Sequence, residues 1–345
     1  MPSAPLAQRL KPAREFLRRL TTIKPQEVKL TVGLDVGSTA VKAIALGPRS
    51  RGEGLRPILG QSLAPLEAGQ EADASGAIRT AVSALHVPVR TVNLSVSGQW
   101  VIMRILEMPK MKPAELKQAL PFEAQRYLPF NIQDVVVDGA LLGPSEANKI
   151  WVLIVACKKE LLERRIDWVK RAGLEVALID VDAVALTNAF LTNGARREAE
   201  STRAIINVGA QLTNLVIVRG EIPYLVRDIP WGGEKLVRHV TEQMGLEPEA
   251  VKQELGRSEP SAEVLNALKL SSEALVTELQ LSFDYFENRF NKPPEELLVT
   301  GGLSQAAGFL EALKSHFSQA VVPWTPVQQL PGQFAVAYGL ALRTN

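Results

Sequence analysis

Two segments of this chain share one pattern, and they lie about half the chain length apart. Residues 30–46 read LTVGLDVGSTAVKAIAL, and residues 204–218 read AIINVGAQLTNLVIV. In each segment, two apolar runs of β-type residues flank a turn of small residues, which is the pattern of a β-hairpin. Superposing the segments aligns three pairs of residues: Asp35 with Asn207, Gly37 with Gly209, and Lys42 with Asn214. A repeat at half the length of a 345-residue chain predicts two domains of like topology that face each other.

Between and after the hairpins, short apolar runs alternate with segments of helical periodicity. The runs predict strands at residues 92–96, 101–106, 135–137, 150–156 and 297–299. The periodic segments predict helices at residues 113–128, 158–172, 181–190, 262–290, 305–317 and 334–342, with further helices after Gly233 and Pro248. Pro121 is expected to kink or split the helix at 113–128. Strands that alternate with helices indicate an α/β fold.

Composition narrows the range of functions. The formal net charge is +2, so the chain has no overall field for holding nucleic acid. Cys157 is the single cysteine and follows an apolar run, which favours a buried structural thiol over a nucleophile. No run reaches the roughly 18–20 apolar residues that span a bilayer, and the N-terminus lacks a signal-peptide pattern. We therefore expect a soluble cytoplasmic protein, with a basic tail at residues 1–27 that is solvated rather than bound to lipid.

The turn of the first hairpin carries groups that suit phosphate. A tight turn around Gly37 exposes successive backbone N–H groups, which can hold phosphate oxygens. Ser38 and Thr39 add hydroxyl donors, and Lys42 adds a point positive charge for the terminal phosphates. Asp35 is expected to hold Mg²⁺ through water, because that ion gives up its own waters reluctantly. The alternative is an ordinary hairpin in which Asp35 and Gly37 serve only the turn.

The second hairpin and two glycine pairs favour a nucleotide cleft over coincidence. Further donors for the phosphates are expected from the second hairpin: Asn207, Gly209, Gln211 and Thr213. Contacts to the nucleoside are expected at and beside the glycine pairs, from Gly232, Gly233, Glu234, Lys235, Gly301 and Gly302. Glycines at the ends of strands or the starts of helices let the backbone approach a ligand closely. The sequence thus predicts a site for ATP or ADP with Mg²⁺.

The order of these motifs resembles that of the superfamily of actin, sugar kinases and DnaK-type chaperones. Within it, three strings are similar to the PilM family of type IV pilus proteins: GLDVGS at 33–38, the stretch from Met108-Pro109 to EAQRYLPF at 123–130, and IPWGG at 229–233. The resemblance implies an actin-like (duplicated ribonuclease H-like) two-domain fold with an extra subdomain of the FtsA and PilM type. The expected ranges are 28–103 for the first domain, 104–180 for the extra subdomain, 181–202 for a crossing helix and linker, and 203–345 for the second domain. The helix at 334–342 is expected to be the second crossing helix.

The same resemblance implies a role. PilM-type proteins bind ATP at the cytoplasmic face of the inner membrane and capture the short N-terminal segment of the membrane protein PilN. It implies a nucleotide-binding scaffold for pilus assembly, twitching motility and competence, peripheral to the membrane through a PilN-like partner and other inner-membrane pilus components. We expect an extended peptide to lie in a groove between the extra subdomain and the first domain.

Two positions depart from the family pattern. Asn207 stands where the second phosphate hairpin usually has Asp, and a neutral amide cannot act as a base or help position Mg²⁺ and water. The string Ala-Glu-x-x-Lys near the adenosine is replaced by AVKQE at 250–254, in which Lys252 can substitute only from a shifted position. Hydrolysis is therefore expected to be slow or absent, with no catalytic residue assigned.

Two other functions remain open. A sugar or acetate kinase of the same superfamily needs a general base between its domains, and no Asp or His stands out in that role from the sequence. His86, His239 and His316 lie in or beside helical patterns and are expected to be surface or packing residues. An FtsA-like filament protein is the other alternative, although FtsA ends in an amphipathic membrane-binding helix and this chain ends soon after its last core helix. The related secretion protein GspL has a transmembrane helix, which the pattern of this chain does not predict.

Overall fold

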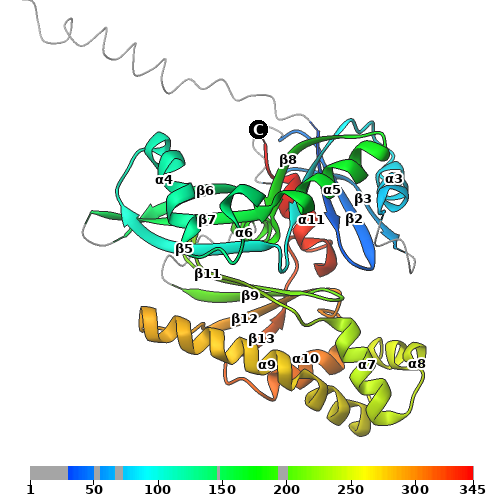
Figure 1. Cartoon of the computed structure of the whole chain (residues 1–345). Coiled ribbons are helices and arrows are strands. Elements are labelled where there is room, and N and C mark those ends of the chain that lie inside the picture. The colour runs from blue at the N-terminus through cyan, green and yellow to red at the C-terminus, as the bar shows by residue number, and fades with distance from the viewer. Residues whose placement is uncertain (1–29, 50–54, 67–72, 146–147, 193–200, 345) are drawn as a thin grey trace, which may run out of the picture.

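The first of three β-sheets forms the core of the first domain (Figure 1). The computed structural model describes residues 30–49, 55–66, 73–145, 148–192 and 201–344, so the predicted tail at 1–27 lies outside the described residues. The sheet has the order β3-β2-β1-β4-β8. Its strands are β1 (Thr31–Val36), β2 (Ala40–Leu46), β3 (Ile58–Pro65), β4 (Thr91–Val96) and β8 (Glu175–Val181). β1, β2 and β3 are antiparallel neighbours, whereas β4 runs parallel to β1 and to β8.

The second sheet repeats the first. It has the order β11-β10-β9-β12-β13. Its strands are β9 (Thr202–Val208), β10 (Thr213–Arg219), β11 (Ile222–Ile229), β12 (Glu296–Gly301) and β13 (Ala320–Pro323). β9, β10 and β11 are antiparallel neighbours, and β12 is parallel to β9 and to β13, as in the first sheet. The predicted duplication of an α/β unit is therefore confirmed, and the fold is actin-like.

Two helices of small residues lie between the sheets. They are α6 (Asp182–Thr192) and α11 (Ala335–Ala341), and their buried side chains share one core with Ile44 of the first sheet and Ile205 of the second. The helices approach so closely that a Cβ at Gly339 would lie 1.9 Å from the carbonyl oxygen of Ala185. A Cβ at Gly33 would likewise lie 2.0 Å from the carbonyl oxygen of Ala337. Glycine at these positions is therefore what allows β1, α11 and α6 to stack.

A third, three-stranded sheet with the order β5-β7-β6 stands beside the first domain (Figure 1). Its strands are β5 (Val101–Pro109), β6 (Val135–Pro144) and β7 (Lys149–Lys158), and α4 (Pro113–Gln125) packs on one face of it. α4 runs as one helix through Pro121, where a kink or split was expected, and ends at Gln125. The opposite face of the sheet contributes Met103, Trp151 and Leu153 to the central core.

The extra subdomain expected at 104–180 covers more than this third sheet. β8 falls inside that range, but it pairs with β4 and so belongs to the first sheet. α5 (Lys159–Arg171) also contacts β8 and α3 (Ser75–Ser83) of the first domain. The third sheet itself begins at Val101 and its last strand ends at Lys158.

The remaining helices cover the second sheet. They are α7 (Gly233–Met244), α8 (Pro248–Leu255), α9 (Ala262–Phe290) and α10 (Ala307–Lys314). α9 begins and ends where the sequence predicted, since the Ser261 hydroxyl accepts a hydrogen bond from the Val264 N–H at its start and Asn291 adopts a left-handed conformation after its end. None of the helices in the described part of the chain is long and apolar enough to cross a membrane.

Candidate functional site

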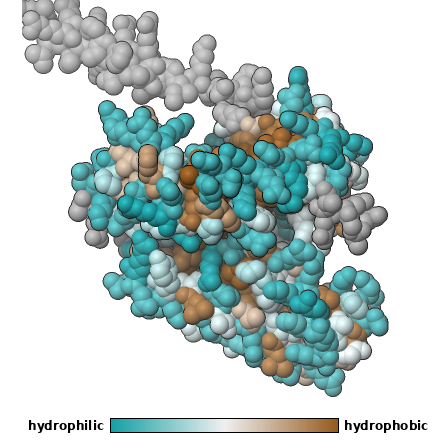
Figure 2. All heavy atoms as spheres, viewed as in Figure 1, coloured by the Kyte–Doolittle hydropathy of each residue, from teal (hydrophilic) through white to brown (hydrophobic). Residues whose placement is uncertain are grey.

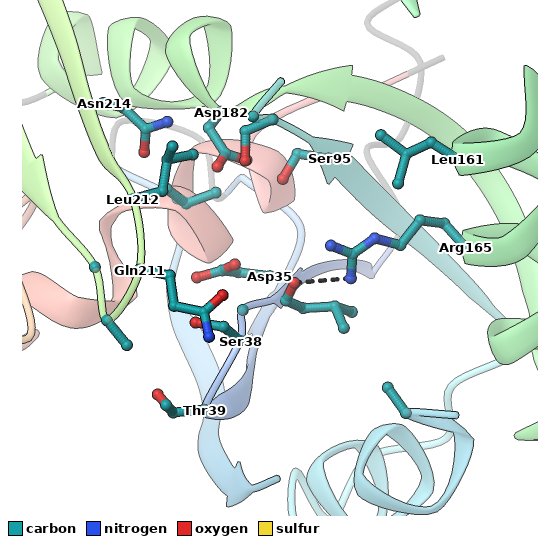
Figure 3. Close-up of a pocket in the computed structure, with 18 of the residues that line it drawn as sticks. Asp35, Ser38, Thr39, Ser95, Leu161, Arg165, Asp182, Gln211, Leu212 and Asn214 are labelled. Carbon is teal, nitrogen blue, oxygen red and sulfur yellow. Dashed lines mark hydrogen bonds between the residues drawn. The ribbon is translucent and has the colours of Figure 1, made fainter. Parts of the chain in front are cut away.

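A cavity of about 420 Å³ lies between the β1–β2 and β9–β10 hairpins (Figure 3). The loop between β4 and β5 and one face of α5 complete its walls. Figure 3 shows Leu161 and Arg165 of α5 on one side of the cavity and Gln211, Leu212 and Asn214 on the other. The predicted phosphate residues that line it are Asp35, Gly37, Ser38, Thr39, Lys42, Asn207, Gly209 and Gln211.

The first hairpin is closed by a hydrogen bond from the Gly37 N–H to the carbonyl oxygen of Ala40, at 3.1 Å. Asp35 and Lys42 are direct partners across β1 and β2. Lys42 Nζ donates to Asp35 Oδ2 over 3.0 Å, and both side chains are largely buried. The local turn chemistry that the sequence predicted thus brings a carboxylate, a cation and two hydroxyl-bearing residues to one edge of the cavity.

The second hairpin has the same frame with neutral groups. The Gly209 N–H donates to the carbonyl oxygen of Leu212 over 2.9 Å. Asn207 and Asn214 are direct partners across β9 and β10, and Asn207 Nδ2 donates to Asn214 Oδ1 over 2.8 Å. Thr213, also predicted as a phosphate residue, is buried and its hydroxyl donates to the carbonyl oxygen of Trp231, so it does not line the described cavity.

The glycines expected at the nucleoside lie behind the second hairpin rather than in the cavity wall of the described chain. A Cβ at Gly232 would lie 2.5 Å from the carbonyl oxygen of Ala210, and the Gly233 N–H donates to the carbonyl oxygen of Gly209. Gly301 adopts a φ of +91°, and a Cβ there would lie 2.4 Å from the carbonyl oxygen of Val208. The Gly302 N–H donates to the same carbonyl oxygen. These glycines let α7 and β12 pack against the hairpin and so fix its shape.

The charged residues expected near the nucleoside have other partners. Glu234 accepts a hydrogen bond from Gln211 Nε2 over 3.1 Å, which ties α7 to the cavity wall. Lys235 donates to the carbonyl oxygen of Pro230. Lys252 forms an exposed ion pair with Glu249 on α8, at 2.6 Å, and is not among the residues that line the described cavity.

Asp182 at the start of α6 is a cavity residue that the sequence pattern did not predict. Burial, followed by the nearby charge of Asp35, raises the pKa of Asp182 from 3.8 to about 6, although hydrogen bonds from Ser95 and Ser97 act in the opposite direction. A carboxyl group that titrates near neutral pH can accept a proton from a hydroxyl or a water molecule in the cavity. Asp182 follows β8 directly and reaches the cavity only in the folded chain, which is why no Asp stood out from the sequence as a possible base.

Asp228 on β11 extends the polar row of the second hairpin toward the first domain. It is the cross-strand partner of Asn214, whose Nδ2 donates to Asp228 Oδ1 over 2.8 Å. The backbone N–H of Gly98, in the loop that joins β4 to β5, donates to Asp228 Oδ2 over 2.6 Å. Burial raises the pKa of Asp228, and these two hydrogen bonds oppose that effect. The row from Asn207 to Gly98 is thus a direct polar link between the two domains.

A family model described as type IV pilus assembly protein PilM matches residues 33–345 of this chain. The solved structure titled "PilM-PilN type IV pilus biogenesis complex" has 25% sequence identity and a TM-score of 0.78, and the match covers 90% of this chain and 97% of that one. The third sheet lies within the matched region.

Two more distant structures share the fold. The ethanolamine utilization protein EutJ from Carboxydothermus hydrogenoformans has 13% identity and a TM-score of 0.56, over 98% of this chain and 99% of that one. A Bacteroides thetaiotaomicron protein with an actin-like ATPase fold and unknown function has 13% identity and a TM-score of 0.51, over 92% of this chain and 98% of that one. Both agree with the actin-like architecture of the two duplicated sheets.

Proposed function

Because the chain belongs to the PilM family of type IV pilus assembly proteins, we propose that it is a nucleotide-binding scaffold of a type IV pilus machine. It holds the cytoplasmic N-terminal segment of a PilN-like membrane protein and so works at the cytoplasmic face of the inner membrane. The observation that carries this proposal is the similarity to a PilM–PilN complex over nine-tenths of the chain.

The ligand of the cavity is ATP or ADP with Mg²⁺. A volume of about 420 Å³ falls within the range of small-molecule sites, roughly 300–1,000 Å³. Lys42 supplies charge to the phosphates, Ser38 and Thr39 supply hydroxyl donors, and the turn at Gly37 supplies backbone N–H groups. Asp35 is the carboxylate suited to Mg²⁺, through the waters that this ion retains. Asn207 and Gln211 offer neutral donors from the opposite wall.

The PilN-like segment is held by the subdomain that contains the third sheet. Three large apolar side chains of this subdomain are exposed: Phe122 at 74%, Tyr127 at 36% and Val136 at 46%. Figure 2 shows that most of the visible surface is hydrophilic, with smaller apolar areas between, which favours a short peptide over a large apolar partner. An extended peptide gains affinity from main-chain hydrogen bonds and from a few pockets for apolar side chains.

The proposal is tested by fluorescence anisotropy with a labelled peptide that covers the cytoplasmic N-terminus of the PilN-type protein from the same pilus machine. The full chain is used throughout, because removing residues 104–180 would also remove β8 from the first sheet. Phe122→Asp, Tyr127→Asp and Val136→Asp are compared with the natural chain. We expect at least one of them to weaken binding about tenfold or more, as for a central interface residue.

The matched control is Tyr285→Asp on α9, whose side chain is 55% exposed on the second domain. This variant should bind like the natural chain. No binding by the natural chain would remove the scaffold proposal and bring the kinase alternative forward. Binding that is equal in all four variants would leave the family role but exclude this surface of the subdomain.

A further inference from the structure

Arg165 is a cavity residue to which the proposed function assigns no role. It extends from α5, on the wall opposite the second hairpin (Figure 3). Its Nη1 donates to the carbonyl oxygen of Val36 over 2.8 Å, at the last residue of β1 and directly before the phosphate turn. The side chain also lies against Trp168, with the guanidinium carbon 5.0 Å from the ring centre.

The hydrogen-bonding capacity of this guanidinium is incompletely used. Its Nε is buried and has no hydrogen-bond partner among the described residues. Burial lowers the pKa of Arg165, and the charges of Asp182 and Asp35 oppose that effect. A guanidinium stays protonated in proteins, and Arg165 lines the cavity, so it brings to the wall a cation whose hydrogen bonds to the described residues are incomplete. Anionic oxygens arranged like those of a phosphate would satisfy it.

The place of Arg165 in the cavity indicates which part of a nucleotide it would meet. Gln211 on the second hairpin is hydrogen-bonded to Glu234 of α7, so the side of the site expected to hold the nucleoside lies toward the second domain. Lys42 and Asp35 stand at the first hairpin, and α5 lies on the first-domain side beyond it. A polyphosphate chain that starts at the second domain therefore ends nearest to α5.

Building on the proposed nucleotide site, we propose that Arg165 binds the terminal phosphate of a nucleoside triphosphate and so distinguishes it from a diphosphate. Arg165 supplies a second cation to the phosphates, in addition to Lys42, and its planar fork can donate to two oxygens of the terminal group. α5 follows directly on β7, the central strand of the third sheet. The presence of the third phosphate is thus sensed by a helix that is continuous with the partner-binding subdomain.

The test is isothermal titration calorimetry of the full-length chain with Mg²⁺ and either ADP or a non-hydrolysable ATP analogue. Arg165→Gln should lose about tenfold or more in affinity for the triphosphate, the equivalent of one charge-assisted hydrogen bond, and less than about threefold for ADP. Arg165→Lys should retain part of the triphosphate preference, because it keeps the charge without the fork. Lys170→Gln removes an exposed cation from the same helix and should leave both affinities unchanged.

A purely structural role of Arg165 makes a different prediction. If it only braces the carbonyl oxygen of Val36, both substitutions weaken triphosphate and diphosphate binding by the same factor, which would overturn the inference. Unchanged affinities in Arg165→Gln would overturn it as well. Thermal unfolding checks that both variants fold. If Arg165→Gln does not fold, the ratio of triphosphate to diphosphate affinity is compared between Arg165→Lys and the natural chain alone. A natural chain that binds neither nucleotide would overturn the proposed nucleotide site together with this inference. A natural chain that binds both nucleotides, with Arg165 variants that do not change their affinity ratio, would overturn the inference alone.

Discussion

Lys42 and Asp35 face each other across β1 and β2 with Nζ 3.0 Å from Oδ2, at the same place in the first hairpin where Asn214 and Asn207 face each other in the second. The duplicated frame therefore carries an ion pair on one wall of the cavity and two amides on the other. Charge for phosphates and for a metal ion is available at the first hairpin, and the second hairpin offers neutral hydrogen-bonding groups. This asymmetry leads to separate expectations for binding and for turnover.

Lys42→Met should abolish most of the nucleotide binding. The substitution removes the charge that we propose binds the phosphates, and it leaves Asp35 without its ion-pair partner. For the natural chain, Mg²⁺ with ATP or ADP at about 100 times Kd should stabilise the fold by about 2.7 kcal/mol. Differential scanning fluorimetry should show this shift in the natural chain and in Lys252→Met, whose exposed lysine pairs with Glu249 on α8. Equal shifts in Lys42→Met and the natural chain would count against the site.

Asn207→Asp should raise the rate of phosphate release from a low starting value. A carboxylate at this position can help to place Mg²⁺ and the attacking water, which the amide cannot. The same substitution removes the donor that Asn207 Nδ2 gives to Asn214 Oδ1, so the free energy of unfolding should fall by about 1–3 kcal/mol. Phosphate release and thermal unfolding measure the two effects separately. A natural chain that already turns over ATP at roughly 1–100 s⁻¹ would contradict this account of Asn207.

The double variant Asn207→Asp/Asn214→Lys provides a sharper comparison. It places in the second hairpin the pair that Asp35 and Lys42 form in the first, and Asp228 lies next to the new lysine. The ion pair should therefore recover part of the stability lost in the single variant. A double variant that is less stable than Asn207→Asp would show that the two hairpins are not equivalent frames.

The duplicated fold was predictable because each of the two hairpins has a recognisable local sequence pattern. Each has two apolar strands and a turn in which glycine is needed, and these signals do not depend on distant residues. The edge strand β3 was not predicted. Its Leu59 and Leu63 are apolar but face solvent, so the strand lacks the alternation of apolar and polar residues that marks a half-buried strand. No strand was predicted at β8, and most of its residues fell within the range expected for the extra subdomain, because its pairing with β4 joins segments about 84 residues apart, which no local pattern reveals.

Only the part of the cavity formed by the two hairpin turns was predictable from local sequence patterns. The residues at the tip of each hairpin follow from turn chemistry, and the structure brings all of the predicted phosphate residues except Thr213 to the wall of the described cavity. Arg165, Asp182 and Asp228 come from a helix face, a helix start and an edge strand. Arg165 and Asp182 reach the cavity wall, and Asp228 reaches the wall residue Asn214, only through tertiary packing. An acidic residue directly after an apolar strand-like run, as Asp182 follows β8, is the one signal of these three that the sequence offers.

Asp182→Asn should stabilise the protein at neutral pH, and the gain should disappear in acid. Because the pKa of Asp182 is raised from 3.8 to about 6, the folded state binds this proton more tightly than the unfolded state. The carboxylate therefore destabilises the fold above pH 6, by at most about 3 kcal/mol, and the destabilisation fades between pH 6 and pH 4. Asp35, Asp228 and Arg165 are the charged neighbours of this group, and Ser95 and Ser97 can turn their hydroxyls to suit the amide.

The measurement for Asp182 is chemical denaturation of the natural chain and the variant from pH 4 to pH 8. The difference in unfolding free energy should be largest above pH 6 and close to zero near pH 4. A difference that does not vary with pH would mean that the effect comes from packing rather than from ionisation. A variant less stable than the natural chain at pH 8 would contradict the prediction.

The hydrogen bond between Gly98 and Asp228 should control how firmly the two domains are held together beside the cavity. Asp228 uses one carboxylate oxygen for the Gly98 N–H and the other for Asn214 Nδ2, at 2.6 and 2.8 Å. Asp228→Asn keeps the shape but has a single oxygen, so one of the two donors loses its acceptor. Since burial raises the pKa of Asp228, the amide also avoids the cost of a buried charge. The melting temperature should therefore change little, while the inter-domain contact weakens.

Hydrogen exchange followed by mass spectrometry separates these two effects. In Asp228→Asn, the peptide that contains Gly98 should exchange about tenfold faster or more, because its N–H is released when the contact opens. Asp284→Asn on the outer face of α9 is the matched control and should leave that peptide unchanged. Nucleotide should slow exchange of the Gly98 peptide in the natural chain more than in Asp228→Asn, because Asn207 and Asn214 connect the cavity wall to Asp228. Equal slowing in both proteins would mean that the row of side chains does not couple the cavity to this loop, and that the loop responds to the ligand through direct contact alone.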